Sequence, residues 1–131
     1  MNGLFITFEG IEGCGKSTQV ERLAKRLAKA SREVITLREP GGTVIGEAIR
    51  EVVKHPPGDE PISPDTELLL MNASRAQLVQ QAIRPALAKG AVVLCDRFYD
   101  SSLAYQGHGR GLDFAKVQQA IDLAVGETKP S

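Results

Sequence analysis

Apolar residues along this chain occur in two patterns, short continuous runs and spaced stripes. The continuous runs cover residues 4–8, 34–37 and 91–95, and each has the length of a buried strand. Each run is followed by at least one stripe, in which apolar residues recur three and four positions apart. Strands that alternate with helices predict an α/β domain with a parallel sheet.

The stripes predict four amphipathic helices. Residues 20–28 form the first, with charged side chains on its other face, and residues 44–53 form the second. The third begins at Ser63, an N-cap followed by proline at the first helical position. Pro85 is expected to kink or restart this helix, because its ring clashes with the preceding turn and it has no N–H. Asp113 is expected to cap the last helix.

Length and charge limit the kinds of protein that this chain can be. At 131 residues, it is expected to form one domain over residues 1–131. Its sixteen basic and sixteen acidic side chains cancel, which offers no support for binding to nucleic acid or to an anionic membrane. No apolar run approaches the ~20 residues of a membrane span, and no leader-like segment is evident. We therefore expect a cytoplasmic protein that binds neither a nucleic-acid polymer nor a membrane.

The chain has two cysteines and few histidines, and neither type forms a metal-binding pattern. Cys14 and Cys95 lack metal-ligand spacing. Both are expected to be reduced and to act as small buried side chains rather than as nucleophiles. His55 stands beside prolines and is expected at the surface, not in a ligand set.

Residues 4–18 carry the strongest functional pattern, an apolar run that leads into a glycine-rich turn and then a helix. Gly10, Gly15, Lys16 and Ser17 match the pattern G-x-x-x-x-G-K-S. Glycines let backbone N–H groups curl toward phosphate oxygens, the lysine reaches the β- and γ-phosphates, and the serine hydroxyl ligates Mg²⁺. This predicts a nucleoside triphosphate site. Its expected contacts are Gly10, Ile11, Glu12, Gly13, Cys14, Gly15, Lys16, Ser17 and Thr18.

Polar clusters stand at the carboxyl ends of all three predicted strands. They are residues 10–17, residues 38–43 and the pair Asp96 and Arg97. In a parallel sheet these ends share one edge, so the clusters are expected to meet in one crevice. Asp96 occupies the position where P-loop proteins place a carboxylate that holds Mg²⁺. The alternative is a surface aspartate that merely ends a strand.

Three further features suggest a second ligand beside the triphosphate. A polyphosphate repels the carboxylate of Glu12, which is therefore expected to turn toward a hydroxyl donor on another molecule. Arg75 lies among apolar helix positions and needs an anion or a planar acceptor; for it and for Arg38, a structural salt bridge is the alternative. Residues 100–111 gather hydroxyls, an amide and a phenol beside glycines. They predict a base-and-sugar recognition segment with a flexible tail, or else a loop that serves only solubility.

Several sequence segments occur in a distinctive order along the chain. They are Phe-Glu-Gly at residues 8–10, Lys-Ser-Thr-Gln at 16–19, Arg-Glu-Pro-Gly-Gly-Thr at 38–43, Ala-Ser-Arg-Ala-Gln at 73–77, Asp-Arg-Phe at 96–98 and Ser-Ser-Leu-Ala-Tyr-Gln-Gly at 101–107. This order resembles the successive motifs of bacterial thymidylate kinase over essentially the whole chain. The phosphate loop alone is common, whereas the later motifs in this order are specific.

The resemblance implies a P-loop NTPase fold of the nucleoside monophosphate kinase type, with three α/β/α layers around a parallel sheet. It implies transfer of the γ-phosphoryl group of ATP to thymidine monophosphate in the presence of Mg²⁺, giving thymidine diphosphate. It also implies a homodimer. Another P-loop kinase of small molecules is the alternative.

The resemblance also implies roles for individual residues. The acceptor phosphate is already ionised and needs no general base, so catalysis is assigned to the cations Lys16 and Arg97. Ser17 and Asp96 are the implied Mg²⁺ ligands. The implied substrate contacts are Glu12 at the sugar 3′-hydroxyl, Arg38 and Arg97 at the acceptor phosphate, Arg75 at the thymine carbonyl, Ser101, Ser102 and Gln106 around the base or phosphate, and Tyr105 at the sugar 2′ position.

The sequence departs from the family pattern in two places. Met71 stands where the family usually stacks an aromatic ring on thymine, and it is either a softer platform or ordinary core. The family also continues beyond the equivalent of residue 131, into further strands, an arginine-bearing lid and a last helix. Gly13 stands where relatives that do not need the lid carry an arginine. We therefore expect a C-terminally truncated thymidylate kinase, or a nucleotide-binding fragment with little turnover.

Overall fold

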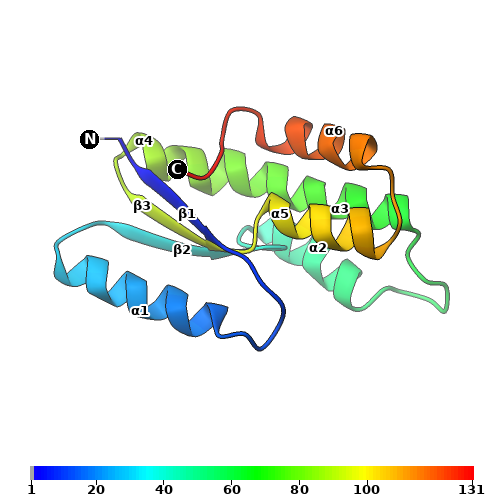
Figure 1. The fold of residues 1–131 in the computed structure, drawn as a ribbon, viewed down its shortest axis with the longest axis horizontal. Helices are drawn as coiled ribbons and strands as arrows, with labels where there is room; N and C mark the ends of the chain where they lie inside the picture. Colours follow the sequence, from blue (N-terminus) through cyan, green and yellow to red (C-terminus); the bar gives the residue numbers. More distant parts are fainter. Residues whose placement is uncertain (1) are drawn as a thin grey trace.

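The computed structural model describes residues 2–131 and contains a three-stranded parallel sheet (Figure 1). The strands are β1 (Leu4–Phe8), β2 (Val34–Arg38) and β3 (Val92–Asp96). Their order is β1-β3-β2, and both neighbouring pairs are parallel. The predicted strands and the parallel sheet are confirmed.

The central strand β3 forms the middle of the core. It pairs with β1 along one edge and with β2 along the other, with Val92 opposite both Leu4 and Val34. Residues 92–95 are at most 1% exposed. A strand that is covered on both faces and both edges has no polar side to present, which explains its continuous apolar sequence. The predicted two-sided burial is confirmed.

Helices cover both faces of the sheet (Figure 1). On one face, α1 (Lys16–Lys29) packs its Val20 against Val92 and Leu94. On the other face lie α3 (Pro64–Leu78) and α6 (Phe114–Val125), which share a larger core with Val93. Alternate residues of β3 thus serve opposite layers, as the pleat of a strand requires. The predicted α/β/α layers are confirmed.

Side-chain caps fix where three helices begin. Thr43 precedes α2 (Val44–Lys54), and its Oγ1 accepts a hydrogen bond from the Gly46 amide at 2.8 Å. Ser63 accepts from the Thr66 amide at 3.2 Å, and Asp113 accepts from the Ala115 amide at 3.0 Å. Each cap satisfies a backbone donor that the first helical turn leaves unpaired. The predicted caps at Ser63 and Asp113 are confirmed.

Pro85 restarts the third predicted helix, as expected. A π-helical turn, Val79–Ile83, follows α3 and leads into α4 (Arg84–Ala88), so that Pro85 lies in the first turn of α4. A proline is tolerated there because the first-turn N–H groups have no partner within their own helix. Helix α4 ends at Ala88, and Gly90, in the turn that follows, has a φ of +81°.

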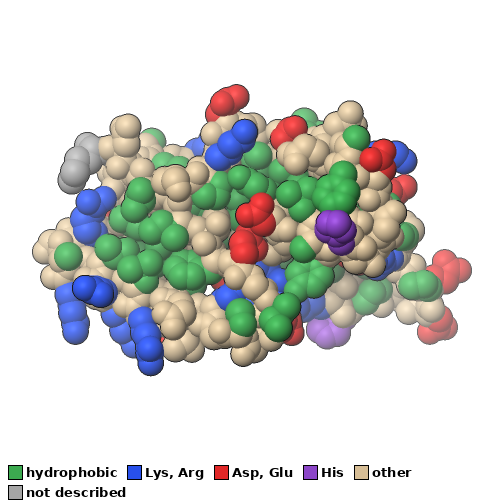
Figure 2. Space-filling view, in the orientation of Figure 1, with side chains coloured by type: hydrophobic (Ala, Val, Ile, Leu, Met, Phe, Trp, Pro, Cys, Tyr) green, Lys and Arg blue, Asp and Glu red, His purple; other side chains and the backbone are tan. Residues whose placement is uncertain are grey.

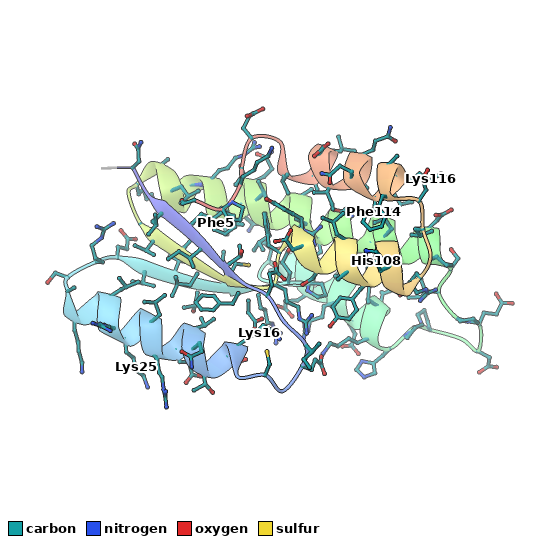
Figure 3. The ribbon with its side chains drawn as sticks, in the orientation of Figure 1. Phe5, Lys16, Lys25, His108, Phe114 and Lys116 are labelled. Carbon is teal, nitrogen blue, oxygen red and sulfur yellow. The ribbon has the colours of Figure 1, made fainter. Side chains whose placement is uncertain are left out.

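Residues 100–111, predicted to be a recognition segment with a flexible tail or a loop, are mostly helical in the structure. The chain forms α5 (Tyr99–Ser102) and then a π-helical segment, Leu103–Gly109. Packing holds this segment in place: the His108 and Phe114 rings meet edge to face, with centroids 4.7 Å apart (Figure 3). A Cβ added at Gly107 would lie 3.5 Å from the Phe114 ring, an ordinary van der Waals distance, so this part of the segment also packs against the ring.

The surface shows two contrasting regions in Figure 2. Basic side chains project from the outer face of α1, where Lys25 and Arg26 are exposed, so the basic face of the first predicted helix is solvated. Apolar side chains gather over β1, and Leu4 is 41% exposed. On its outer edge β1 meets Ser131, whose amide donates to the Phe5 carbonyl at 2.8 Å. Among residues 2–131, no helix is long and apolar enough to cross a membrane.

Leu78 offers a test of the core. It is 0% exposed on α3, so Leu78→Ala is expected to lower the free energy of unfolding by about 2–5 kcal/mol, through lost burial and the cavity left behind. Leu123→Ala, at an 89% exposed position on α6, is the matched control and should change it by less than about 0.5 kcal/mol. Urea denaturation of both variants measures this. Equal losses would contradict the described core.

Candidate active site

A cleft of about 660 Å³ lies at the carboxyl ends of the strands. Its wall is formed by the predicted phosphate loop, the turn after β2, helices α2 and α3, the end of β3 and the segment that follows α5. The expectation that the polar clusters meet in one crevice is confirmed. The predicted residues on its wall are Glu12, Gly13, Lys16, Ser17, Arg38, Met71, Asp96, Arg97, Ser101, Tyr105 and Gln106.

Other predicted site residues lie off this wall. Arg75 and Ser102 are fully buried behind it. Five more predicted contacts do not border the cleft, although all are exposed: Gly10, Ile11, Cys14 and Gly15 in the loop and Thr18 in the first turn of α1. The structure therefore separates the residues on the cleft wall from those buried behind it and from the exposed backbone of the loop beside it.

The phosphate loop, residues 10–17, has a backbone that only glycine adopts freely. Gly13 has a φ of +76° and Gly15 a φ of +92°, in the left-handed region. Helix α1 begins directly after Gly15, and no side chain caps it. The first N–H groups of α1 therefore have no partner within the helix, and together with the helix dipole they favour an anion at this point.

Lys16 spans the mouth of the loop. Its ammonium Nζ donates to the carbonyls of Gly10, at 3.0 Å, and Ile11, at 2.9 Å. Both acceptors are neutral, and charged phosphate oxygens form stronger hydrogen bonds with an ammonium. The geometry thus keeps a cation at the cleft wall where an incoming polyphosphate can recruit it.

Burial differs between the two cysteines. Cys95 is fully buried in β3, and burial raises the pKa of its thiol well above the usual range. Cys14 is exposed in the phosphate loop, with its Sγ 3.9 Å from the Lys16 Nζ, so the prediction of a buried filler is wrong for it. A glycine-rich surface turn provides no core for such a side chain. His55 is exposed and lies 2.9 Å from Glu51, which confirms its expected surface position.

Ser17 and Asp96 form a small set of oxygen donors. The Ser17 hydroxyl lies 3.4 Å from Asp96 Oδ2, and Asp96 Oδ1 is buried without a hydrogen-bond partner. Within residues 2–131 no three His, Cys, Asp or Glu side chains form a metal cluster. Mg²⁺ needs none, because it binds one or two protein oxygens and completes its shell with water and substrate phosphates. The donor set therefore fits Mg²⁺.

Arg38 and Arg97 supply positive charge to the cleft wall. Arg38 contacts Glu47 at 3.0 Å, with both side chains about half exposed, so the salt-bridge alternative holds in this structure. Arg97 places its guanidinium 5.3 Å from the centre of the Tyr105 ring. Its φ of +69° is unusual for a residue with a side chain, and its amide is held by the Phe8 carbonyl at 2.9 Å. Arg97 is thus fixed by the backbone as well as by its side chain.

Arg75 lies in a buried polar network rather than on the cleft wall. It is 0% exposed, and its Nε donates to both carboxylate oxygens of Glu39, at 2.8 and 3.0 Å. Its other nitrogens donate to Asn72 at 2.8 Å and to Ser102 at 2.9 Å. The expected partial enclosure is corrected to full burial, and the salt-bridge alternative describes this structure. Burial of a guanidinium requires such a set of acceptors.

Two acids that the sequence analysis did not single out lie at the cleft or behind it: Glu39 is buried and Glu9 is partly buried. Loss of hydration raises the pKa of Glu39 to about 7, although Arg75 acts to lower it. Burial also raises the pKa of Glu9, against the hydrogen bonds that its carboxylate accepts from Ser101 and from the Phe98 amide. Each acid directly follows a strand that ends at the cleft. This position directly after a strand is the sequence signal that could have identified both acids as residues near the site.

Six cleft residues were not predicted, and four of them are charged: Glu39, Arg50, Lys54 and Glu67, beside Pro40 and Val53. Arg50 and Lys54 lie one helical turn apart on α2, and Arg50 donates to the Pro40 carbonyl at 2.9 Å. Their four-residue spacing is the signal that could have placed both on one face. Glu67 and Met71 both border the cleft, as does Glu39, the residue directly after Arg38. The cleft thus holds more charge of both signs than the motifs alone indicate.

Comparison with known proteins gives a consistent result. The family model "Thymidylate kinase" matches residues 8–131. Thymidylate kinase of Ectopseudomonas mendocina (strain ymp) is 57% identical over 99% of this chain, and that of Chlorobium luteolum is 52% identical over 97%. The matched segments are 61% and 58% of those relatives, so this chain spans about three fifths of their length.

A solved structure supports the fold. The crystal structure of thymidylate kinase from Ehrlichia chaffeensis matches with a TM-score of 0.89 at 39% identity. The match covers 99% of this chain and 68% of that one. The predicted P-loop kinase fold with its parallel sheet is thereby confirmed.

Arg75→Met tests the buried ion pair. In the wild type, Glu39 loses its proton in the folded state only near pH 7, so its contribution to stability falls as the pH rises from its ordinary pKa of 4.5 to about 7. Without Arg75 the folded pKa rises further, and stability continues to fall above pH 7. We expect a deficit of about 3–5 kcal/mol in the free energy of unfolding at pH 8.5, and a smaller one at pH 6.

Urea denaturation at the two pH values measures the deficit. The double variant Glu39→Gln with Arg75→Met is the control, because it has no buried carboxylate to ionise at this site, and its deficit relative to the wild type should not grow as the pH rises. A deficit of Arg75→Met that is equal at pH 6 and pH 8.5 would contradict the coupling.

Proposed function

This chain belongs to the thymidylate kinase family, and we propose that it provides the nucleotide sites for transfer of the γ-phosphoryl group of ATP to thymidine monophosphate, giving thymidine diphosphate. One observation carries the proposal. A phosphate loop and two arginines from the ends of β2 and β3 border the same cleft of about 660 Å³. A donor and an acceptor that both carry phosphate need such a shared, cationic site.

The donor end of the cleft is the phosphate loop. The curled backbone and the start of α1 hold the polyphosphate of ATP, and Lys16 exchanges its two carbonyl partners for phosphate oxygens. Ser17 and Asp96 would hold Mg²⁺, which offsets the negative charge on the phosphates when it is bound.

The acceptor end takes the monophosphate. Arg97 and Arg38 lie at the cleft wall and bind its oxygens, with Arg38 leaving the exposed carboxylate of Glu47 to do so. Backbone N–H groups, Lys16 and Arg97 then stabilise the charge that spreads over the transferred group. A phosphate monoester is largely ionised at neutral pH, so it attacks without a general base. Positioning and charge stabilisation supply the catalysis.

The nucleoside of the acceptor fills the rest of the cleft. Met71 offers an apolar surface to thymine, Ser101 and Gln106 offer polar contacts, and Tyr105 crowds the sugar 2′ position, which favours the deoxy form. Glu12 is exposed at the cleft wall and accepts a hydrogen bond from the sugar 3′-hydroxyl. Arg75 acts from below the wall, by holding Ser102 and Glu39.

The same proposal covers the setting of the protein. Its partners are the nucleotides ATP and thymidine monophosphate, and a second copy of the chain in a homodimer. Its place is the cytoplasm, where both nucleotides are available. Sedimentation of the purified protein tests the dimer independently of the chemistry.

The acceptor is tested by a coupled transfer assay with ATP and Mg²⁺. Thymidine monophosphate is expected to be phosphorylated much faster than the nucleoside thymidine, which lacks the phosphate for the two arginines. It is also expected to be phosphorylated much faster than uridine monophosphate, which lacks the deoxy sugar. A preference for thymidine contradicts the acceptor assignment. Binding of both nucleotides without transfer would restrict this chain to a nucleotide-binding role.

The donor site is tested with Lys16→Met. Loss of a charge-assisted hydrogen bond is expected to weaken binding of Mg²⁺-ATP at least about tenfold, while binding of thymidine monophosphate changes little. Lys25→Met is the matched control, since Lys25 lies on the exposed outer face of the same helix (Figure 3). Titration calorimetry measures both ligands. Unchanged ATP affinity in Lys16→Met would place the triphosphate elsewhere.

A further inference from the structure

Gln106 carries a hydrogen-bond acceptor that nothing in the described chain satisfies. The residue is 3% exposed and borders the cleft. Its Nε2 donates to Glu67 Oε1 at 3.0 Å, whereas its Oε1 is buried without a partner. An unpaired buried acceptor costs about 1–3 kcal/mol. A ligand in the cleft that offers a donor would satisfy it.

The orientation of this amide is not free. An amide can turn over and exchange its donor and acceptor ends. A carboxylate, however, only accepts hydrogen bonds, so Glu67 requires the NH₂ end to face it. Arg110 holds the other oxygen of Glu67 at 2.9 Å, and its second terminal nitrogen donates to the Ile62 carbonyl at 3.0 Å. The carboxylate is thus fixed from behind.

The two ends of the cleft differ in what they offer a nucleotide. The phosphate-binding groups, among them Lys16 and Arg97, come from the phosphate loop and the strand ends. Glu67, Met71 and Gln106 come instead from α3 and from the π-helical segment after α5. When phosphates occupy the cationic end, the base of the acceptor is left to this second group.

We propose that Glu67 is a positioning residue for base selection: held by Arg110, it occupies the NH₂ end of Gln106 and leaves the amide oxygen as the end that can accept a hydrogen bond from a base in the cleft. A fixed acceptor suits a pyrimidine whose ring N3 carries a hydrogen, as in thymine and uracil. Cytosine presents a lone pair at N3, which faces the Gln106 oxygen without a hydrogen between them. The inference rests on the proposed function, since it concerns the base of the same acceptor.

Glu67→Gln tests the inference. A glutamine at position 67 can donate as well as accept, so the Gln106 amide can turn either end toward the base. The affinity ratio of thymidine monophosphate to deoxycytidine monophosphate is expected to fall about tenfold or more. The ratio of thymidine monophosphate to deoxyuridine monophosphate should stay unchanged, because both bases carry the N3 hydrogen. A merely structural role of Glu67 would lower all three affinities together.

Titration calorimetry of the three monophosphates with this chain measures these ratios. Glu127→Gln is the control, since it removes one negative charge at an exposed position beyond α6. Gln106→Leu removes the acceptor itself and is expected to lower the affinity ratio of thymidine monophosphate to deoxycytidine monophosphate in the same way. If Glu67→Gln melts below the assay temperature, Arg110→Gln takes its place, because it frees the carboxylate to swing and should shift the same ratio in the same direction.

The outcomes separate the two proposals. If the wild-type chain does not bind thymidine monophosphate, the proposed function fails. If it binds this nucleotide selectively and the position-67 variant, or its Arg110→Gln replacement, keeps the thymine-to-cytosine ratio, the positioning role of Glu67 is overturned while the proposed function stands.

Discussion

The buried ion pair between Arg75 and Glu39 holds the cleft together. Glu39 belongs to the turn after β2, Arg75 to α3, and the same guanidinium reaches Ser102 at the end of α5. It also lies 5.6 Å from the centre of the Phe98 ring, at the start of that segment. Three parts of the wall are therefore tied to a single side chain. Because an unpaired charge in the core is costly, the turn after β2, helix α3 and the end of α5 hold one another in position through the acceptors that they offer to Arg75.

This arrangement leaves the floor of the cleft short of positive charge. Arg75 lies near two carboxylates, those of Glu39 and Glu9, and the pKa of each is raised by burial. On the cleft wall the balance is reversed, since five cations stand beside four acids: Lys16, Arg38, Arg50, Lys54 and Arg97 against Glu12, Glu39, Glu67 and Asp96. A buried layer with an excess of acids thus supports a cleft wall with a small excess of cations. Zero net charge over the whole sequence conceals this division.

Local sequence was enough for the strands, the helix caps and the phosphate loop, because each depends on neighbouring residues. The β3 run, the cap at Ser63 and the restart at Pro85 are of this kind. It was not enough for Arg75, whose partner Glu39 is 36 positions away in the chain. Nor could it reveal that residues 99–109 are helical, since their glycines favour a loop until packing against α3 and α6 is known.

The π-helical turn Val79–Ile83 joins α3 to α4, and it makes the number of residues in this continuous helical stretch important. A π turn closes its hydrogen bonds over one residue more than an α-helical turn does. Deletion of one residue there would leave the number of residues that a regular α-helical turn holds, so the backbone could close as an α-helix with α4 facing nearly the same way relative to α3. Arg84 would then still reach Thr128 Oγ1, 2.8 Å from its Nε, and the Val125 carbonyl. A one-residue deletion should therefore be tolerated at this π turn, whereas a second deletion would rotate α4 by about 100° and carry Arg84 away from both acceptors.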